Sequence, residues 1–301
     1  MSLPKHVKIV EVGPRDGLQA ETIILPVETR IQFIDLLSET GLQAIEVGSF
    51  VSPLWVPQLA ESGAVYQGIT KKENVDYSLF VPNQKGYEIA LENNVKSIAV
   101  FTAASETFCH KNMNVSCEES IDRFRKFIPE AKVKGMRIRG YISCAISCPY
   151  EGPIAPAAVH KIVSKLLILG CDEISLGDTT GSGTPHQVQD LLKDIPSPPE
   201  KLAVHFHDTY GQALANIYAS LKKGISVIDC AVSGLGGCPY APGASGNVAT
   251  EDVVFLLNGL EIKTKINCEK LLKAADFIDN HLNRQTSSKA SRALRTSHPL
   301  A

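Results

Sequence analysis

Short apolar runs alternate with longer amphipathic segments along this chain. The short runs are rich in β-branched residues and predict eight buried strands, at residues 6–12, 44–50, 76–82, 97–103, 137–145, 173–179, 202–208 and 227–234. Longer segments between them have helical periodicity, as at 28–41, 160–170 and 214–224. The first and third of these end in polar residues and Gly, as helix C-termini do. The pattern therefore predicts strands and helices in alternation.

Repeated βα units with nearly continuous apolar strands predict a parallel sheet that is covered on both faces. A count of eight favours a closed (β/α)8 TIM barrel, and no GxGxxG follows the first strand, which disfavours an open dinucleotide-binding sheet. We predict one α/β catalytic domain over residues 1–301. Its barrel core spans 6–260, extra helices follow within 261–290, and the polar, weakly patterned residues 291–301 are expected to be a mobile tail.

Composition and charge narrow the possible partners. The 301 residues are 44% hydrophobic and 21% charged, which excludes disorder of the whole chain. The formal net charge is -2 and no long run of one sign occurs, so neither nucleic acid nor a membrane surface is an expected partner. The N-terminus has no apolar signal core and no Arg-rich amphipathic stretch. We expect a cytoplasmic or already processed protein that acts on small molecules.

The eight cysteines do not resemble a secreted disulfide framework, so reduced thiols are expected. Cys144 and Cys148 lack a second pair at zinc-site spacing, which favours a structural role. Cys238 differs because it lies among glycines and prolines in a segment typical of a loop. Either it is an incidental turn residue, or it is a thiol that meets the substrate when the loop closes.

Polar residues gather where the predicted strands end. In a parallel barrel the active site forms at the C-terminal ends of the strands. The candidates at these positions are Arg15, Asp16, Glu46, Asp178, His205, His207 and Asp208.

His205 and His207 are separated by one residue, so on a strand both imidazoles point to the same side. They are either a hydrogen-bonded core pair or, together with Asp16, an open metal site. Asn247 could add a carbonyl oxygen, although an Asn in a Gly-rich loop also serves turns. Ligand types alone leave zinc, iron, manganese and magnesium open.

Five segments resemble the 3-hydroxy-3-methylglutaryl-CoA lyase family: GPRDGLQ (13–19), SCAISCPYEG (143–152), EISLGDT (173–179), HFHDTYGQALAN (205–216) and GLGGCPYAPGASGNVATED (234–252). The RDG and HxHD motifs also occur in a wider superfamily of barrel metallolyases and Claisen-type synthases, whereas the cysteine loop is more specific. Ala20 departs from the Asn that often follows RDGLQ in the family.

The resemblance implies residue roles. Asp16, His205, His207 and Asn247 would bind a divalent cation, Mg²⁺ or Mn²⁺. Arg15 would lie beside the thioester carbonyl, Glu46 and Asp178 would support proton transfer and position ligands, and Cys238 would be the acid/base group of the closing loop.

The reaction that the resemblance implies is a retro-Claisen cleavage of an acyl-CoA to acetyl-CoA and acetoacetate, by a homodimer. The general base would be Asp178 or His205. Three alternatives stay open: a Claisen-type synthase, a lyase for longer 3-substituted glutaryl-CoA esters, and a barrel that binds acyl-CoA or metal without turnover.

Overall fold

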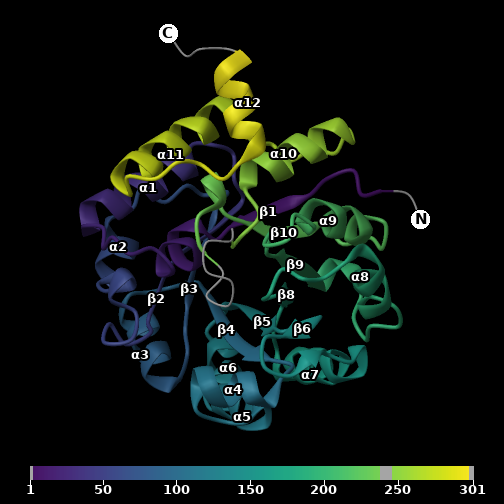
Figure 1. Ribbon diagram of the computed structural model, residues 1–301. Coiled ribbons are helices and arrows are strands. Elements are labelled where there is room, and N and C mark those ends of the chain that lie inside the picture. The colour runs from purple at the N-terminus through teal and green to yellow at the C-terminus, as the bar shows by residue number, and fades with distance from the viewer. Residues whose placement is uncertain (1–2, 238–245, 298–301) are drawn as a thin grey trace.

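Eight parallel strands close into a barrel in the computed structural model of the protein, which describes residues 3–237 and 246–297 (Figure 1). The last strand pairs with the first, and the ring consists of β1 (Lys8–Glu11), β2 (Ala44–Ser49), β3 (Asp76–Phe80), β4 (Ser97–Ala103), β5 (Arg137–Ser143), β8 (Glu173–Asp178), β9 (Leu202–Phe206) and β10 (Val227–Cys230). Every predicted strand segment contains one of these strands. The predicted TIM barrel is therefore confirmed.

Helices surround the barrel on its outside (Figure 1). They are α1 (Val27–Ser38), α2 (Ser62–Gly68), α3 (Gln84–Glu92), α4 (Glu106–Met113), α5 (Cys117–Arg125), α6 (Ile128–Val133), α7 (Pro156–Leu169), α8 (Pro185–Leu191), α9 (Ala213–Leu221), α10 (Thr250–Gly259), α11 (Cys268–His281) and α12 (Lys289–Ser297). Short 3₁₀ turns are η2 (Pro57–Leu59), η3 (Pro199–Lys201) and η4 (Val232–Gly234), and β6 (Ser147–Cys148) pairs antiparallel with β7 (Gly152–Pro153). The predicted helices at 28–41, 160–170 and 214–224 correspond to α1, α7 and α9.

Local sequence explains where several helices begin and end. The side chains of Asn83, Ser105 and Asn267 each accept a hydrogen bond from a backbone N–H in the first turn of the helix that follows. Ser116 forms a reciprocal capping box with Glu119 at the start of α5. These contacts satisfy backbone donors that would otherwise lack partners and so fix the helix starts.

The C-terminal segment contains a helix that the sequence pattern did not predict. Of the predicted tail 291–301, the residues up to Ser297 belong to α12, and 298–301 lie outside the described residues. Oδ1 of Asp252, on α10, accepts hydrogen bonds from Oγ of Ser288 at 2.8 Å and from the backbone N–H of Ala290 at 2.6 Å. The start of α12 is thus anchored by a distant residue, which the local pattern of the tail could not indicate.

The barrel interior is polar at several positions although its strands are buried. All residues of β2, β8, β9 and β10 are buried. Among them are seven polar side chains, Glu46, Ser49, Glu173, Ser175, Asp178, His205 and Asp229. Buried charges are costly unless they are paired, so this interior marks where the function of the barrel is to be sought.

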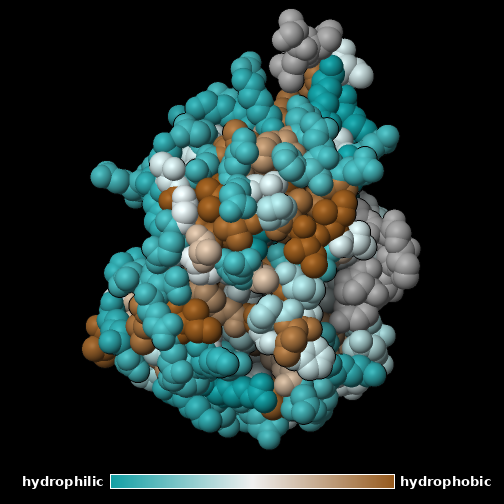
Figure 2. Space-filling model, turned by 90° about the vertical axis from the view of Figure 1, so that its left-hand side faces the viewer, coloured by the Kyte–Doolittle hydropathy of each residue, from teal (hydrophilic) through white to brown (hydrophobic). Residues whose placement is uncertain are grey.

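In the described ranges, no helix has both the length and the hydrophobicity to cross a bilayer. Figure 2 shows the side that carries α1 to α3, where hydrophobic patches are separated by hydrophilic residues.

Cys144 and Cys148 lie buried in a small apolar cluster with Phe108, a position that suits the structural role expected for them.

Candidate active site

The segment after β1 forms a π-helical turn, η1 (Gly13–Gly17), that carries Arg15 and Asp16. The carbonyl oxygen of Val12 accepts hydrogen bonds from the backbone N–H groups of Arg15, Asp16 and Gly17, at 3.1, 2.7 and 3.2 Å. The bond from Gly17 spans five residues, which is the pattern of a π-turn and is frequent at functional sites. The turn fixes the two charged residues next to each other at the end of the strand.

Glu46 holds Arg15 from the neighbouring strand. The register between β2 and β3 shifts directly after Glu46, and such bulges re-aim side chains. Nε of Arg15 donates to Oε2 of Glu46 at 2.6 Å, and its NH1 donates to Oδ1 of Asp16 at 2.6 Å. The guanidinium carbon also lies 5.3 Å from the ring centroids of both Phe80 and Tyr141. Two carboxylates and two aromatic rings thus orient this cation.

Asp16, His205 and His207 form a cluster that could hold a metal ion. Each offers one ligand atom, and these atoms lie within 4.8 Å of one another. The two imidazoles face the same side, as predicted, with their ring centroids 5.5 Å apart. Nε2 of His205 lies 3.9 Å from Oδ2 of Asp16. One carboxylate and two imidazoles are a donor set that suits a divalent cation with open positions.

Asn247 reaches this cluster from the other end of the chain. Its Nδ2 donates to Oδ2 of Asp16 at 2.9 Å and to the backbone carbonyl of Leu235 at 3.1 Å. Its backbone forms an antiparallel bridge with His207. The Asn247 amide therefore lies beside the Asp16 carboxylate and near His207. In this position its hydrogen bonds support the fold, and its carbonyl oxygen could bind a cation.

Opposite charges control the ionisation of Arg15 and Asp16. Burial alone would lower the pKa of Arg15, but the carboxylates of Glu46 and Asp16 raise it above its ordinary value. Burial alone would raise the pKa of Asp16, but Arg15, His205 and His207 hold it well below the usual range. Both side chains are thus charged near neutral pH.

The two histidines have different electrostatic surroundings. Burial and the neighbouring His205 lower the pKa of His207 to about 4. Burial acts in the same direction on His205, but its hydrogen bond with Asp229 and the charge of Asp16 raise the pKa of His205 above its ordinary value. At neutral pH His207 is therefore uncharged and keeps a lone pair, as a metal ligand must.

This barrel has close relatives among known proteins. A family model described as HMGL-like matches residues 6–278. The chain belongs to the HMGL-like family. A mouse protein named hydroxymethylglutaryl-CoA lyase, mitochondrial, is 54% identical over 294 residues, which are 97% of this chain and 90% of the mouse protein.

Solved structures of HMGL-like proteins agree with this assignment. The structure of hydroxymethylglutaryl-CoA lyase from Pseudomonas aeruginosa superimposes with a TM-score of 0.97 at 51% identity, over 99% of this chain and 100% of that one. An HMG-CoA lyase from Acinetobacter baumannii, in complex with coenzyme A and 3-methylmalate, has a TM-score of 0.93 at 35% identity and covers 100% of both chains. The family that the sequence motifs indicated is confirmed, and with it the enzyme class, a carbon–carbon lyase.

Not every predicted residue of this HMGL-like chain lies in the cluster. The structure brings six of them together, Arg15, Asp16, Glu46, His205, His207 and Asn247. Asp178 ends the neighbouring strand β8, and its Oδ2 accepts the backbone N–H of Gly183 at 2.8 Å. Oδ1 of Asp208 accepts the backbone N–H of Ala213 at the start of α9, at 3.0 Å. Cys238 lies outside the described residues.

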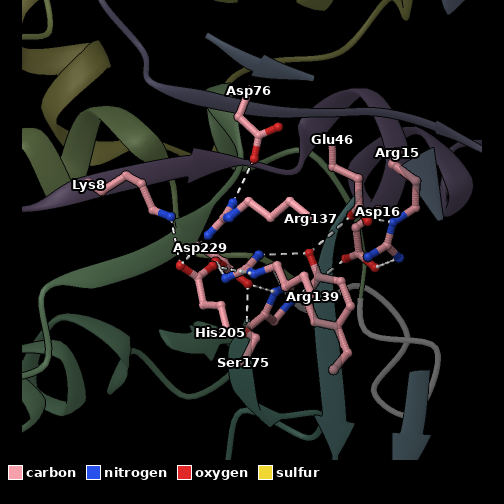
Figure 3. A network of polar contacts seen from close by, with 12 residues as sticks. Lys8, Arg15, Asp16, Glu46, Asp76, Arg137, Arg139, Ser175, His205 and Asp229 are labelled. Carbon is pink, nitrogen blue, oxygen red and sulfur yellow. Dashed lines mark hydrogen bonds and ion pairs between the residues drawn. The ribbon is translucent and has the colours of Figure 1, made fainter. Parts of the chain in front are cut away.

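A group of buried polar residues next to the candidate active site was not predicted from the sequence. Arg139 and Asp229 project into the barrel (Figure 3). Together with Tyr141 they connect His205 with Glu46 through a chain of polar contacts. A signal was present in the sequence, because Arg139 and Asp229 each interrupt an apolar strand run with a charge. A charged side chain that points into the barrel needs an oppositely charged or hydrogen-bonding partner there. Only the register between the strands shows which residue that partner is.

Proposed function

We propose that this protein cleaves 3-hydroxy-3-methylglutaryl-CoA to acetyl-CoA and acetoacetate with the help of Mg²⁺ or Mn²⁺. The observation that carries the proposal is the position of Arg15, whose guanidinium donates to Asp16 directly beside the Asp16, His205 and His207 cluster. A fixed cation next to a metal site suits a reaction in which negative charge develops on a thioester oxygen. Relatives that match nearly the whole chain are named hydroxymethylglutaryl-CoA lyase.

Asp16, His205, His207 and Asn247 would hold the cation. When bound, the cation would lower the pKa of the substrate's tertiary hydroxyl and orient its oxygens. The donor set fits this task, since His207 is neutral and Asp16 is ionised near neutral pH. We propose magnesium or manganese because the carboxylate and amide oxygens of Asp16 and Asn247 suit these ions.

The protein's own side chains would move the protons and stabilise the charge. A base removes the proton of the tertiary hydroxyl, and the C–O bond becomes the carbonyl of acetoacetate as the adjacent C–C bond breaks. The base is Asp178, or it is His205 when its Nε2 is not engaged as a ligand. The electron pair of that bond forms the enolate of acetyl-CoA, whose oxygen accepts a charge-assisted hydrogen bond from Arg15. Cys238 then delivers a proton to the enolate carbon.

Glu46 would act on this step through Arg15. Its Oε2 lies 2.6 Å from Nε of Arg15, while NH1 of Arg15 contacts Asp16. This contact holds the plane of the guanidinium still, so that no reorientation is required when the enolate forms. We therefore assign Glu46 a positioning role.

The test compares three reactions of the purified, chelator-treated protein. Hydroxymethylglutaryl-CoA with added Mg²⁺ or Mn²⁺ should release acetoacetate, measured with a coupled dehydrogenase, and omission of metal should abolish the release. A longer 3-substituted glutaryl-CoA should react more slowly. Condensation of acetyl-CoA with a keto acid in place of cleavage, or full activity after chelation, would contradict the proposal.

The proposal has three further parts: the substrate is an acyl-CoA, the protein is a homodimer, and it is located in the cytoplasm. The complex of the A. baumannii lyase with coenzyme A supports the first of these. Light scattering coupled to size-exclusion chromatography tests the second, with a mass of twice 32.5 kDa expected. Fractionation of the source cells tests the third.

A further inference from the structure

Asp229 lies beside His205 on the neighbouring strand, inside the barrel (Figure 3). The parallel register between β9 and β10 pairs Asp229 directly with His205. Oδ2 of Asp229 lies 3.3 Å from Nδ1 of His205, and Asp229 is 1% exposed. The contact is therefore built by strand pairing and is shielded from water.

Two further contacts hold the Asp229 carboxylate in place. NH2 of Arg139 donates to its Oδ1 at 2.5 Å, and Oγ of Ser175 donates to its Oδ2 at 2.8 Å. Arg139 is itself fixed, because its Nε lies 2.8 Å from Oε1 of Glu173 and its NH1 donates to the hydroxyl of Tyr141 at 2.9 Å. Both oxygens of Asp229 thus have donors, and the carboxylate has one orientation to offer His205.

The two ring nitrogens of His205 face two different carboxylates. Nδ1 faces Oδ2 of Asp229 in the interior, and Nε2 faces Oδ2 of Asp16 at 3.9 Å. A neutral imidazole carries one N–H. If Nε2 carried it, the bare Nδ1 would lie against a carboxylate oxygen, acceptor against acceptor. If Nδ1 carries it, the contact becomes a hydrogen bond and the lone pair of Nε2 points toward Asp16.

We propose that Asp229 is a positioning residue that holds His205 as the Nδ1–H tautomer, with Nε2 directed at the metal site. Carboxylates that accept the second N–H of a metal-binding histidine orient the ring and increase its basicity as a ligand. Arg139 and Ser175 act one step further away, since they keep the oxygens of Asp229 in place. The inference rests on the proposed metal site but not on the proposed substrate.

Metal binding without substrate tests the role of Asp229. Free Mn²⁺ is measured by electron paramagnetic resonance during titration of the metal-depleted protein. We expect Asp229→Asn to weaken the affinity about 10- to 100-fold, the range found for such partners of ligating histidines. Asn keeps only one acceptor oxygen, so it cannot accept both from NH2 of Arg139 and from Nδ1–H of His205 as the two oxygens of Asp229 do.

Asp252→Asn is the matched control. It makes the same substitution at another buried carboxylate, but the described hydrogen bonds of Asp252 are with Ser288, Lys289 and Ala290 at the start of α12 and include neither His205 nor Arg139. We expect its Mn²⁺ affinity to stay within about twofold of the wild type, although its thermal stability falls. Equal affinity of Asp229→Asn and wild type, or an equal loss in both variants, would overturn the assignment to Asp229.

A second measurement does not depend on the folding of any Asp229 variant. ¹⁵N spectra of the Mg²⁺-loaded wild type, with His205 identified from the signal missing in His205→Gln, should show the ring proton on Nδ1. A proton on Nε2 overturns the inference. Failure of the wild type to bind Mn²⁺ at all would instead contradict the metal site under "Proposed function", so the two failures are distinguishable.

Discussion

Nε of Arg15 lies 2.6 Å from Oε2 of Glu46, although one residue follows the first strand and the other lies within the second. This ion pair is buried, so the guanidinium is aligned before any substrate arrives. We predict that Arg15→Met lowers turnover by about 10²- to 10³-fold, as expected when a donor to a developing oxyanion is lost. Steady-state assay measures turnover, and Mn²⁺ titration should show that metal affinity is largely retained.

Arg15→Lys serves as the comparison for Arg15→Met. It keeps the positive charge but cannot donate to Glu46 and Asp16 with a planar fork, so intermediate activity is expected. Wild-type turnover in Arg15→Met, accompanied only by a lower melting temperature, would mean that Arg15 has a structural role and no part in the reaction.

Cys238 is predicted to deliver the proton to carbon. The hydroxyl of Ser is a far weaker acid than a thiol, so Cys238→Ser should reduce turnover by about 10²- to 10⁴-fold, the usual contribution of a general acid or base. Cys268→Ser, at the start of α11, is the matched control and should keep full activity. Unchanged activity of Cys238→Ser would refute the acid role.

The ionisation of Glu11 should make stability depend on pH. Glu11 is 0% exposed and accepts hydrogen bonds from the backbone N–H groups of Gly13 and Val232 and from the hydroxyl of Thr250. Burial outweighs these bonds and raises its pKa from 4.5 to about 7. The folded state therefore retains this proton where the unfolded chain has lost it, and stability is lost as pH rises through the window between the two values.

Glu11→Gln cannot ionise and should lack this loss. A shift of this size corresponds to roughly 3 kcal/mol at about 1.4 kcal/mol for each pKa unit. Urea unfolding of both proteins at pH 5 and pH 8 measures the free energy of unfolding. We expect the wild type to lose more stability than Glu11→Gln between these pH values. The same pH dependence in both would show that Glu11 remains ionised throughout.

Gly17 allows the turn after β1 to lie against the segment near Leu235. A Cβ on Gly17 would lie 2.6 Å from Cβ of Leu235 and 3.3 Å from its carbonyl carbon. Gly17→Ala should therefore destabilise the protein by about 1–3 kcal/mol and displace Asp16, which weakens Mn²⁺ binding. Thermal unfolding and Mn²⁺ titration measure the two effects. Gly259→Ala is the control, because a Cβ there meets no atom within 4 Å.

The parts of the site that could be predicted from the sequence are those set by local geometry. His205 and His207 share a face because side chains alternate along a strand, and Arg15 and Asp16 follow a strand that ends where its apolar run ends. The contact between Asp229 and His205 depends on the pairing of two strands, which no local pattern encodes. The contacts by which Asp252 anchors α12 also join residues far apart in the sequence, so the local pattern could not predict them.

The hydrogen bond between Asn247 and Asp16 joins residues that are 231 positions apart. A chain still emerging from the ribosome has Asp16 outside long before Asn247 is made, and β1 lacks its partner β10 for most of that time. One edge of β1 therefore remains unpaired until β10 has been synthesised. Assembly of the metal-binding cluster and closure of the barrel are consequently one late event of synthesis, and a prematurely terminated chain carries half a site.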